Sequence, residues 1–165
     1  MGGGQRALAL RHAGHRYHRA HPLWPTDGRA RKSYNPKNKG KKSYQPILTF
    51  LAETREYIWG ELRNGDRPTG GQIARHLASV FAALPKGVTQ IFARADSGFY
   101  CWQAVQAYEQ AQASFLIVAR KTARWLEQRQ TANGKPSPNT DADQQCEFCY
   151  QPEGWGKAYR FIALR

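Results

Sequence analysis

Hydrophobic and polar positions follow two different patterns along the chain. Residues 1–43 combine Gly, His, Arg, Lys and Pro without a helical or a strand period, which predicts loop or disorder. From residue 45 onward, compact apolar runs alternate with stretches of helical spacing. Compact runs are typical of buried strands, and helical spacing is typical of helices with one buried face. The sequence therefore predicts an ordered domain after residue 43.

This periodic part predicts strands and helices in alternation. Strands are expected at residues 45–52, 57–63, 88–95, 114–119, 147–150 and 158–164. Helices are expected at residues 70–84, 101–112 and 120–130, and a polar loop at residues 131–144. The buried faces of the first two helices are expected to carry Ile73, Leu77, Val80, Phe81 and Leu84, and then Trp102, Val105 and Tyr108 or Glu109. This order of elements predicts an α/β fold with a mixed sheet.

Charge separates the same two regions. The chain carries a formal charge of +13, but residues 1–42 hold 11 of its 25 Lys and Arg and one acid, Asp27. Such a basic segment favours polyanions such as nucleic acid, although a solvated basic arm has the same composition. No apolar run approaches the ~18 residues of a membrane span, and no secretory signal is visible. We therefore expect a cytoplasmic protein without a membrane partner.

Two patterns suggest zinc at first sight. Histidine recurs at every third position, as His12, His15, His18 and His21. A period of three does not place four side chains on one helix face, so zinc is not expected there. Cys146 and Cys149 form a single Cys-x-x-Cys pair within an expected strand, and no second pair completes a zinc site. Buried or inert thiols are the simpler interpretation.

Asp96 is the sharpest candidate for chemistry. It follows the expected strand at residues 88–95 and precedes Ser97-Gly98, which favours a turn. In open α/β sheets, ligands bind at the carboxyl ends of strands, and a carboxylate there is a suitable Mg²⁺ ligand. The structural alternative is that Asp96 caps a helix beginning near Cys101 or forms an Asx turn.

Several linked motifs resemble those of one enzyme family. The run Arg94–Tyr100, Arg-Ala-Asp-Ser-Gly-Phe-Tyr, is similar to the second-aspartate motif of DDE transposases of bacterial insertion sequences, in the insertion-sequence-1380 group related to the insertion-sequence-4 group. Tyr34–Lys37 (Tyr-Asn-Pro-Lys), the segment Ser43–Thr54 and the turn Leu62–Asp66 also resemble family motifs in the same order. The resemblance extends over about residues 28–165.

The resemblance implies a ribonuclease-H-like mixed sheet with flanking helices. Three carboxylates of that family hold two divalent ions, here expected to be Mg²⁺, which support DNA strand cleavage and joining. The implied partner is DNA carrying terminal inverted repeats, in the bacterial nucleoid, and the complete enzyme is expected to form a dimer. We expect a partial catalytic core at residues 29–130 and the start of a β-rich insertion at residues 131–165.

Asp96 is expected to be the second of the three carboxylates, and the other two are missing. In the family, the Glu belongs to a segment whose first residues resemble Ala158–Ala163 of this chain. No Glu follows here before Arg165, which predicts that the chain is truncated. The first-strand motif, Asp-x-Asp-Ser/Thr-Thr, is absent upstream of the basic segment. Synonymous codons for Gly14–Gly28, read one base later, encode Asp-Thr-Asp-Thr-Thr and a later Tyr-Gly. Residues 1–28 are therefore interpreted as an out-of-frame or disordered segment, which leaves the sheet incomplete and the chain inactive alone.

Basic residues provide the expected DNA contacts. They are Arg31, Lys32, Lys37, Lys39, Lys41, Lys42, Arg94, Arg120 and Lys121. Tyr34 and Tyr44 flank the basic run and are suited to packing on a sugar or a base. For Arg120 and Lys121, the alternative interpretation is that they are ordinary exposed charges at the start of a helix. Two rival functions stay open: another ribonuclease-H-like nuclease such as a resolvase, and a non-catalytic DNA-binding remnant that competes with a full-length transposase.

Overall fold

The computed structural model describes residues 6–14, 31–32, 42–132, 134–136 and 144–164. The chain divides into two compact units, Met1–Val118 and Ala119–Arg165. The division expected from the sequence placed residues 120–130 in the catalytic core. In the structure, the helix in this region groups with the late strands of the second unit instead.

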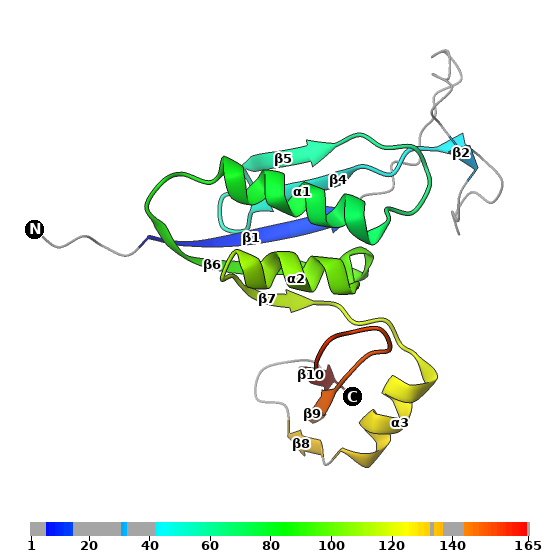
Figure 1. Cartoon of the computed structure of the whole chain (residues 1–165). Coiled ribbons are helices and arrows are strands. Elements are labelled where there is room, and N and C mark those ends of the chain that lie inside the picture. Colours follow the sequence, from blue (N-terminus) through cyan, green and yellow to red (C-terminus); the bar gives the residue numbers. More distant parts are fainter. Residues whose placement is uncertain (1–5, 15–30, 33–41, 133, 137–143, 165) are drawn as a thin grey trace, which may run out of the picture. The chain divides into compact units, whose positions relative to one another are not determined.

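The first unit is built on a five-stranded mixed sheet (Figure 1). In spatial order, its strands are β5 (Tyr57–Glu61), β4 (Ile47–Leu51), β1 (Arg6–Gly14), β6 (Val88–Ala95) and β7 (Ser114–Ile117). The central strand β1 runs antiparallel to β4 and parallel to β6, while β5 is antiparallel to β4 and β7 is parallel to β6. The predicted α/β fold with a mixed sheet is thereby confirmed.

The first strand of this sheet corrects two expectations. Loop or disorder was predicted for residues 1–43, yet Arg6–Gly14 forms β1 at the centre of the sheet. Leu10 and His12 are buried and Arg11 between them is exposed, which is the alternation of a strand covered on one face. The sheet is therefore not missing its first strand, although the sequence of β1 contains no aspartate. The possibility that residues 1–28 are out of frame stays a hypothesis.

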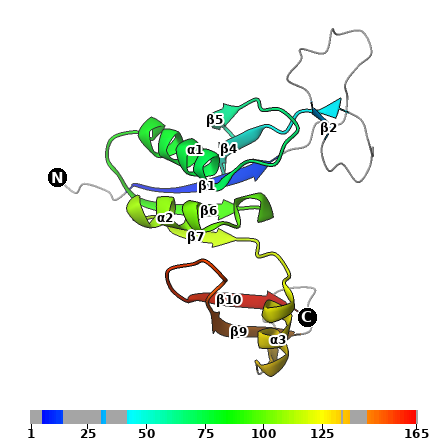
Figure 2. The same ribbon diagram turned by 45° about the vertical axis from the view of Figure 1, so that its right-hand side comes forward.

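Two helices cover one face of the sheet. Helix α1 (Gly70–Ala83) and helix α2 (Trp102–Gln110) lie on the same side in both views (Figures 1 and 2). Thr69 begins α1 with a capping box, because its hydroxyl accepts from the Gln72 N–H and the Gln72 side chain accepts from the Thr69 N–H. Such a cap satisfies backbone donors that an uncapped helix leaves without partners. The predicted first helix at residues 70–84 is confirmed to within one residue.

The core lies between these helices and the sheet. Its buried apolar members include Leu10, Ile47, Ile73, Leu77, Val80, Ala93, Ala95, Phe99, Ala104 and Tyr108. The expected inward residues of α1 are confirmed, with Phe81 and Leu84 partly buried at the rim. On α2, Val105 and Tyr108 are buried as predicted, whereas Trp102 is half-buried.

The second unit combines a short helix with a three-stranded antiparallel sheet. The helix is α3 (Ala123–Thr131), and the strands are β8 (Gly134–Pro136), β9 (Gln144–Tyr150) and β10 (Tyr159–Leu164) in the order β10-β9-β8. Trp125 of α3 is buried and packs on Phe148, which stacks on Phe161. The region predicted as a loop at residues 131–144 contains a strand, β8. Its Gly and Pro residues lie at the edge of the sheet, where they disturb the hydrogen bonding between strands least.

Candidate active site

Asp96 lies at the carboxyl end of β6, as the sequence predicts. The strand ends at Ala95, and Asp96 then begins a single 3₁₀ turn, η1 (Ser97–Phe99). Its Oδ1 atom accepts a hydrogen bond from the Gly98 N–H at 2.8 Å, so the Asx turn of the structural alternative is present, while the role of Asp96 as a metal ligand stays a prediction. The alternative of a cap on the next helix is wrong, because Cys101 occupies the N-cap of α2. One oxygen of the carboxylate thus fixes the turn.

At position 98, glycine is favoured because little space is left for a side chain, and not because the backbone has an unusual angle. A Cβ atom at this position would lie 2.7 Å from the Asp96 Oδ1 atom, which is closer than real Cβ contacts allow. Any side chain at position 98 would therefore displace the carboxylate from its hydrogen bond. A glycine two positions after Asp96 therefore allows the carboxylate to keep this orientation.

The register of the sheet places the end of β1 beside Asp96. His12 pairs with Ala95, so Ala13 and Gly14, the last residues of β1, lie next to the strand end that carries Asp96. Neighbouring parallel strands present their carboxyl ends at one sheet edge. In this chain that neighbouring position carries Gly14, and no described residue of β1 is acidic.

A buried polar cluster, formed by His12, Thr49 and His76, lies on the helix-covered face of the sheet. The Thr49 hydroxyl is 2.7 Å from His12 Nδ1 and 2.8 Å from His76 Nε2, and all three residues are at most 1% exposed. Because the hydroxyl both donates and accepts, it can satisfy one nitrogen of each ring at once. Sequence reasoning missed Thr49 and His76, although His76 on the apolar face of α1 was an available signal.

This cluster packs beneath the turn that carries Asp96. The ring of Phe99, the last residue of η1, lies 5.4 Å from the His12 ring and 6.2 Å from the His76 ring, centroid to centroid. Burial lowers the pKa of His12 to about 3, with a further contribution from His76, and lowers the pKa of His76 to about 4. Both rings are therefore neutral near pH 7 and form part of the core that supports the turn.

The described residues do not assemble a complete divalent-metal site. Within the parts of the chain that the structure describes, no group of three or more His, Cys, Asp or Glu lies close enough to hold an ion. Of the four histidines that recur at every third position, His12 is buried in the core, where its Nδ1 atom is hydrogen-bonded to Thr49, and His15, His18 and His21 lie outside the described residues. Asp96 supplies a single carboxylate, whereas a two-metal site needs several. These residues therefore do not fit the two ions of the family by themselves.

Cys146 and Cys149 are free thiols on strand β9. Positions three apart on a strand point to opposite faces, and Cys146 is accordingly buried while Cys149 is exposed. The two sulfur atoms therefore face away from each other, which excludes their joint coordination of one ion. Of the two thiols expected to be buried or inert, Cys146 is buried and Cys149 is exposed.

The predicted DNA-contacting residues fall into three groups. Arg31 and Lys32 form the short strand β2, which pairs with β3 (Lys42–Ser43), and Lys32 and Lys42 are register partners in this pair. Arg94 is exposed on β6, two positions before Asp96, whereas Arg120 and Lys121 belong to the second unit. The remaining predicted contacts, Lys37, Lys39 and Lys41, lie outside the described residues, as does Tyr34.

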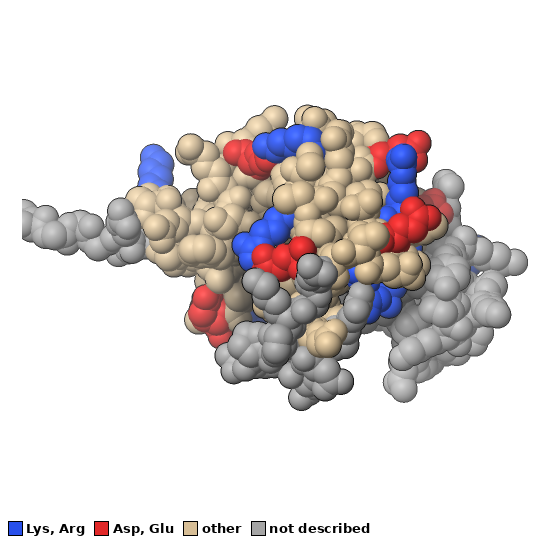
Figure 3. All heavy atoms as spheres, turned by 90° about the horizontal axis from the view of Figure 1, so that it is seen from below, with Lys and Arg blue, Asp and Glu red and all other residues tan. Residues whose placement is uncertain are grey.

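The surface charge of the described residues is mixed in sign. Seen from below, Lys and Arg are interspersed with Asp and Glu over the described part of the surface (Figure 3). This agrees with the near balance of acidic and basic residues after position 42. Among the described residues, no helix is long and apolar enough to cross a membrane.

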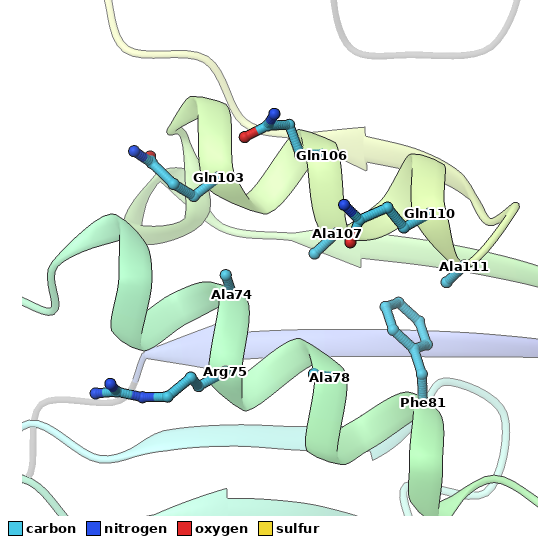
Figure 4. A pocket seen from close by; sticks show the side chains of 9 residues that line it. All are labelled: Ala74, Arg75, Ala78, Phe81, Gln103, Gln106, Ala107, Gln110 and Ala111. Atoms are coloured by element: carbon cyan, nitrogen blue, oxygen red, sulfur yellow. The ribbon is translucent and has the colours of Figure 1, made fainter.

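A groove of about 520 Å³ lies between α1 and α2 (Figure 4). It is lined by Ala74, Arg75, Ala78, Phe81, Gln103, Gln106, Ala107, Gln110 and Ala111. Its walls carry neither a carboxylate nor a histidine nor a cysteine, so they supply neither general acid–base groups nor metal ligands. The strand end at Asp96 therefore remains the candidate active site.

Comparison with known proteins gives one family match and one similar solved structure. A family model described as transposase DDE domain group 1 matches residues 25–164. The structure is also similar to a solved structure entitled "Crystal structure of a pre-cleavage Mos1 transpososome", at 12% sequence identity and a TM-score of 0.44. That similarity covers 70% of this chain and 36% of the other, so this chain spans about a third of its length. A search of curated proteins finds no match. Since the family model covers most of the sequence, the chain belongs to the group 1 family of transposase DDE domains.

Proposed function

We propose that this chain is part of the catalytic core of a bacterial insertion-sequence transposase, of the insertion-sequence-1380 group, and that Asp96 is its second acidic residue. The observation that carries the proposal is the position of Asp96 at the end of β6, beside the end of β1, in a mixed sheet. The Arg94–Tyr100 motif and the family match support the same assignment. The substrate is DNA bearing the inverted repeats of a mobile element, acted on in the nucleoid.

Asp96 would be one of the ligands of a divalent ion, which we propose to be Mg²⁺. Such an ion stabilises charge on the reacting phosphate and lowers the pKa of bound water. The role of this chain's own residues is to hold the Asp96 carboxylate: the Gly98 N–H fixes one oxygen, and Phe99 anchors the turn in the core. The described residues provide one carboxylate of the set, so we propose that the chain binds DNA but does not cut it alone.

DNA binding would involve the basic residues outside the sheet core. Lys32 and Lys42 are register partners in the β2–β3 pair, and a pair of basic residues suits contacts with the phosphates of a DNA backbone. Arg94, Arg120 and Lys121 would add contacts from the two units. Contacts of this kind position DNA without reading its sequence.

The nucleotide sequence tests whether the first carboxylate lies in another frame. Read one base later, the codons for Gly14–Arg19 are expected to encode Asp-x-Asp-Thr. The shifted aspartates would replace Gly14 and Arg16, and Gly14 is the residue at the end of β1 beside Asp96. Sequencing the coding DNA decides the matter, and a shifted frame without this motif would refute the out-of-frame hypothesis.

A supercoiled plasmid carrying the inverted repeats tests the proposed function. The chain is expected to retard this DNA in a gel but to leave it uncut in the presence of Mg²⁺. Asp96→Asn should leave the retardation unchanged, because it removes a metal ligand and not a phosphate contact. A chain extended beyond Arg165 and carrying aspartates in place of Gly14 and Arg16, which restores the missing carboxylates, should cut, and its Asp96→Asn variant should not. Cutting by the extended Asp96→Asn variant would contradict the role of Asp96, and Asp96-dependent cutting by the present chain would contradict its inactivity.

A further inference from the structure

The face of the sheet opposite the two helices carries a pair of adjacent arginines. Arg11 of β1 and Arg94 of β6 are register partners in the parallel pair, and both are exposed. Their chain neighbours Leu10, Ala93 and Ala95 are buried on the helix side, so both guanidinium groups project from the open side. The arginines thus lie side by side on one face, at the centre of the sheet.

Two like charges at this spacing favour an anion between them. Neighbouring strands lie about 4.8 Å apart, so the two side chains emerge close together, and their mutual repulsion is unfavourable. Neither Arg11 nor Arg94 forms a hydrogen bond or an ion pair with another residue that the structure describes. A phosphate group would offset the repulsion, and two guanidinium groups offer it paired donors from both sides.

The surroundings indicate what kind of phosphate fits. Phe92 is 50% exposed and Leu116, the partner of Arg94 on β7, is 58% exposed, so the arginines rise from an open apolar surface. A free phosphate ion is usually held in a concave cradle of backbone N–H groups, which a flat strand surface does not provide. An extended phosphodiester backbone fits such a surface, because neighbouring apolar side chains can pack on its sugars and bases.

The pair also lies close to the candidate active site. Arg94 lies near the carboxyl end of β6, and Asp96 follows that strand directly, two positions later in the chain. A phosphate held by the two arginines would therefore lie near the strand end that carries the carboxylate. We propose that Arg11 and Arg94 form a phosphate-binding pair that holds a DNA strand beside Asp96. The proposal deepens the proposed function and rests on it for the identity of the ligand.

The test is DNA binding by the full chain in EDTA, where no metal-dependent cutting takes place. Fluorescence anisotropy with labelled single-stranded and duplex oligonucleotides compares the wild type with Arg11→Gln, Arg94→Gln and the double variant. Arg75→Gln is the matched control, because Arg75 is also exposed but lies on α1, on the other side of the sheet. The double variant should bind about tenfold more weakly, and its slope of log affinity against log salt should fall by about 1.4–1.8, as expected for two lost phosphate contacts. The control should change affinity less than about twofold.

Two results would overturn the pair. One is equal weakening by Arg75→Gln, which indicates diffuse charge, and the other is unchanged affinity in the double variant. Inorganic phosphate tests whether the pair binds a free ion instead of DNA. If phosphate raises the melting temperature of the wild type but not of the double variant, and both proteins bind oligonucleotides equally well, the site binds free phosphate and the DNA assignment is wrong. Melting curves show whether each variant is folded. Weaker DNA binding by the double variant supports the phosphate-binding pair even if the extended chain never cuts DNA. Failure of the proposed function can therefore be distinguished from failure of this inference.

Discussion

Acidification from pH 7 to pH 4 is expected to lower the free energy of unfolding by roughly 3 kcal/mol or more through the buried histidines. In the folded chain, burial lowers the pKa of His12 to about 3 and that of His76 to about 4, whereas an unfolded histidine titrates near pH 6.5. As the pH falls below about 6.5, the unfolded chain therefore takes up protons first. Stability is fully present above this pH and is lost progressively toward pH 3. Urea unfolding at half-unit pH intervals measures this change.

A control separates the histidines from other titrating groups. His12→Gln keeps a side chain that can hydrogen-bond to Thr49 but does not titrate, and the double variant with His76→Gln removes both groups. Carboxylates protonate in the same acidic range and add their own pH dependence to every variant. The slope of stability against pH between 6.5 and 4 should therefore be smaller in His12→Gln and smallest in the double variant. Equal slopes in all three proteins would show that the histidines are not buried as neutral rings.

Replacing the Thr49 hydroxyl is expected to have the largest effect of any single substitution proposed here. Thr49→Val keeps the shape of the side chain but removes the partner of both His12 Nδ1 and His76 Nε2. Leaving a buried polar atom without a partner costs about 1–3 kcal/mol, so we expect a loss of roughly 2–4 kcal/mol. The midpoint of urea unfolding, at constant slope, measures this loss.

Thr49→Ser is the matched control for this substitution. It keeps the hydroxyl and loses a buried methyl group, which should cost only about 1 kcal/mol. The order of stability is therefore expected to be Thr, then Ser, then Val. If Val is as stable as Ser or more so, the hydroxyl contributes nothing through its two hydrogen bonds, and the cluster is held by packing alone.

Sequence patterns predicted the helices better than the first strand. Ile73, Leu77 and Val80 repeat at helical spacing, and the Thr69–Gln72 capping box begins the same helix, so local signals agree. In β1, by contrast, the inward positions are Leu8, Leu10 and His12, and a buried histidine breaks the expected alternation of apolar and polar residues. The strand is specified by pairing with β4 and β6, far away in the sequence, and no local pattern reveals such pairing.

In the candidate site, too, local features were easier to predict than contacts between distant residues. Asp96 could be singled out because its position at the end of a strand and its turn are local, with the carboxylate, Ser97 and Gly98 consecutive in the sequence. Its role as the second acidic residue was inferred from the resemblance of the surrounding motifs and stays a prediction. The His12–Thr49–His76 cluster was not predicted, because its members are 37 and 27 positions apart and meet only through the sheet register and the packing of α1. Arg11 was not predicted for the same reason, since its pairing with Arg94 depends on β1 lying beside β6.

The central position of β1 has a consequence for how the chain folds. Leu10 pairs with Leu51 on one side and with Ala93 on the other, so β1 joins the β4–β5 hairpin to the parallel β6–β7 pair. These two halves share no direct strand pairing, and each can form local contacts long before the sheet is complete. Strands β1 and β6 are far apart in the sequence, so bringing them together costs chain entropy before their contacts stabilise the sheet. This entropy cost slows folding. The rate-limiting step is therefore expected to be the insertion of β1 between two pre-formed halves.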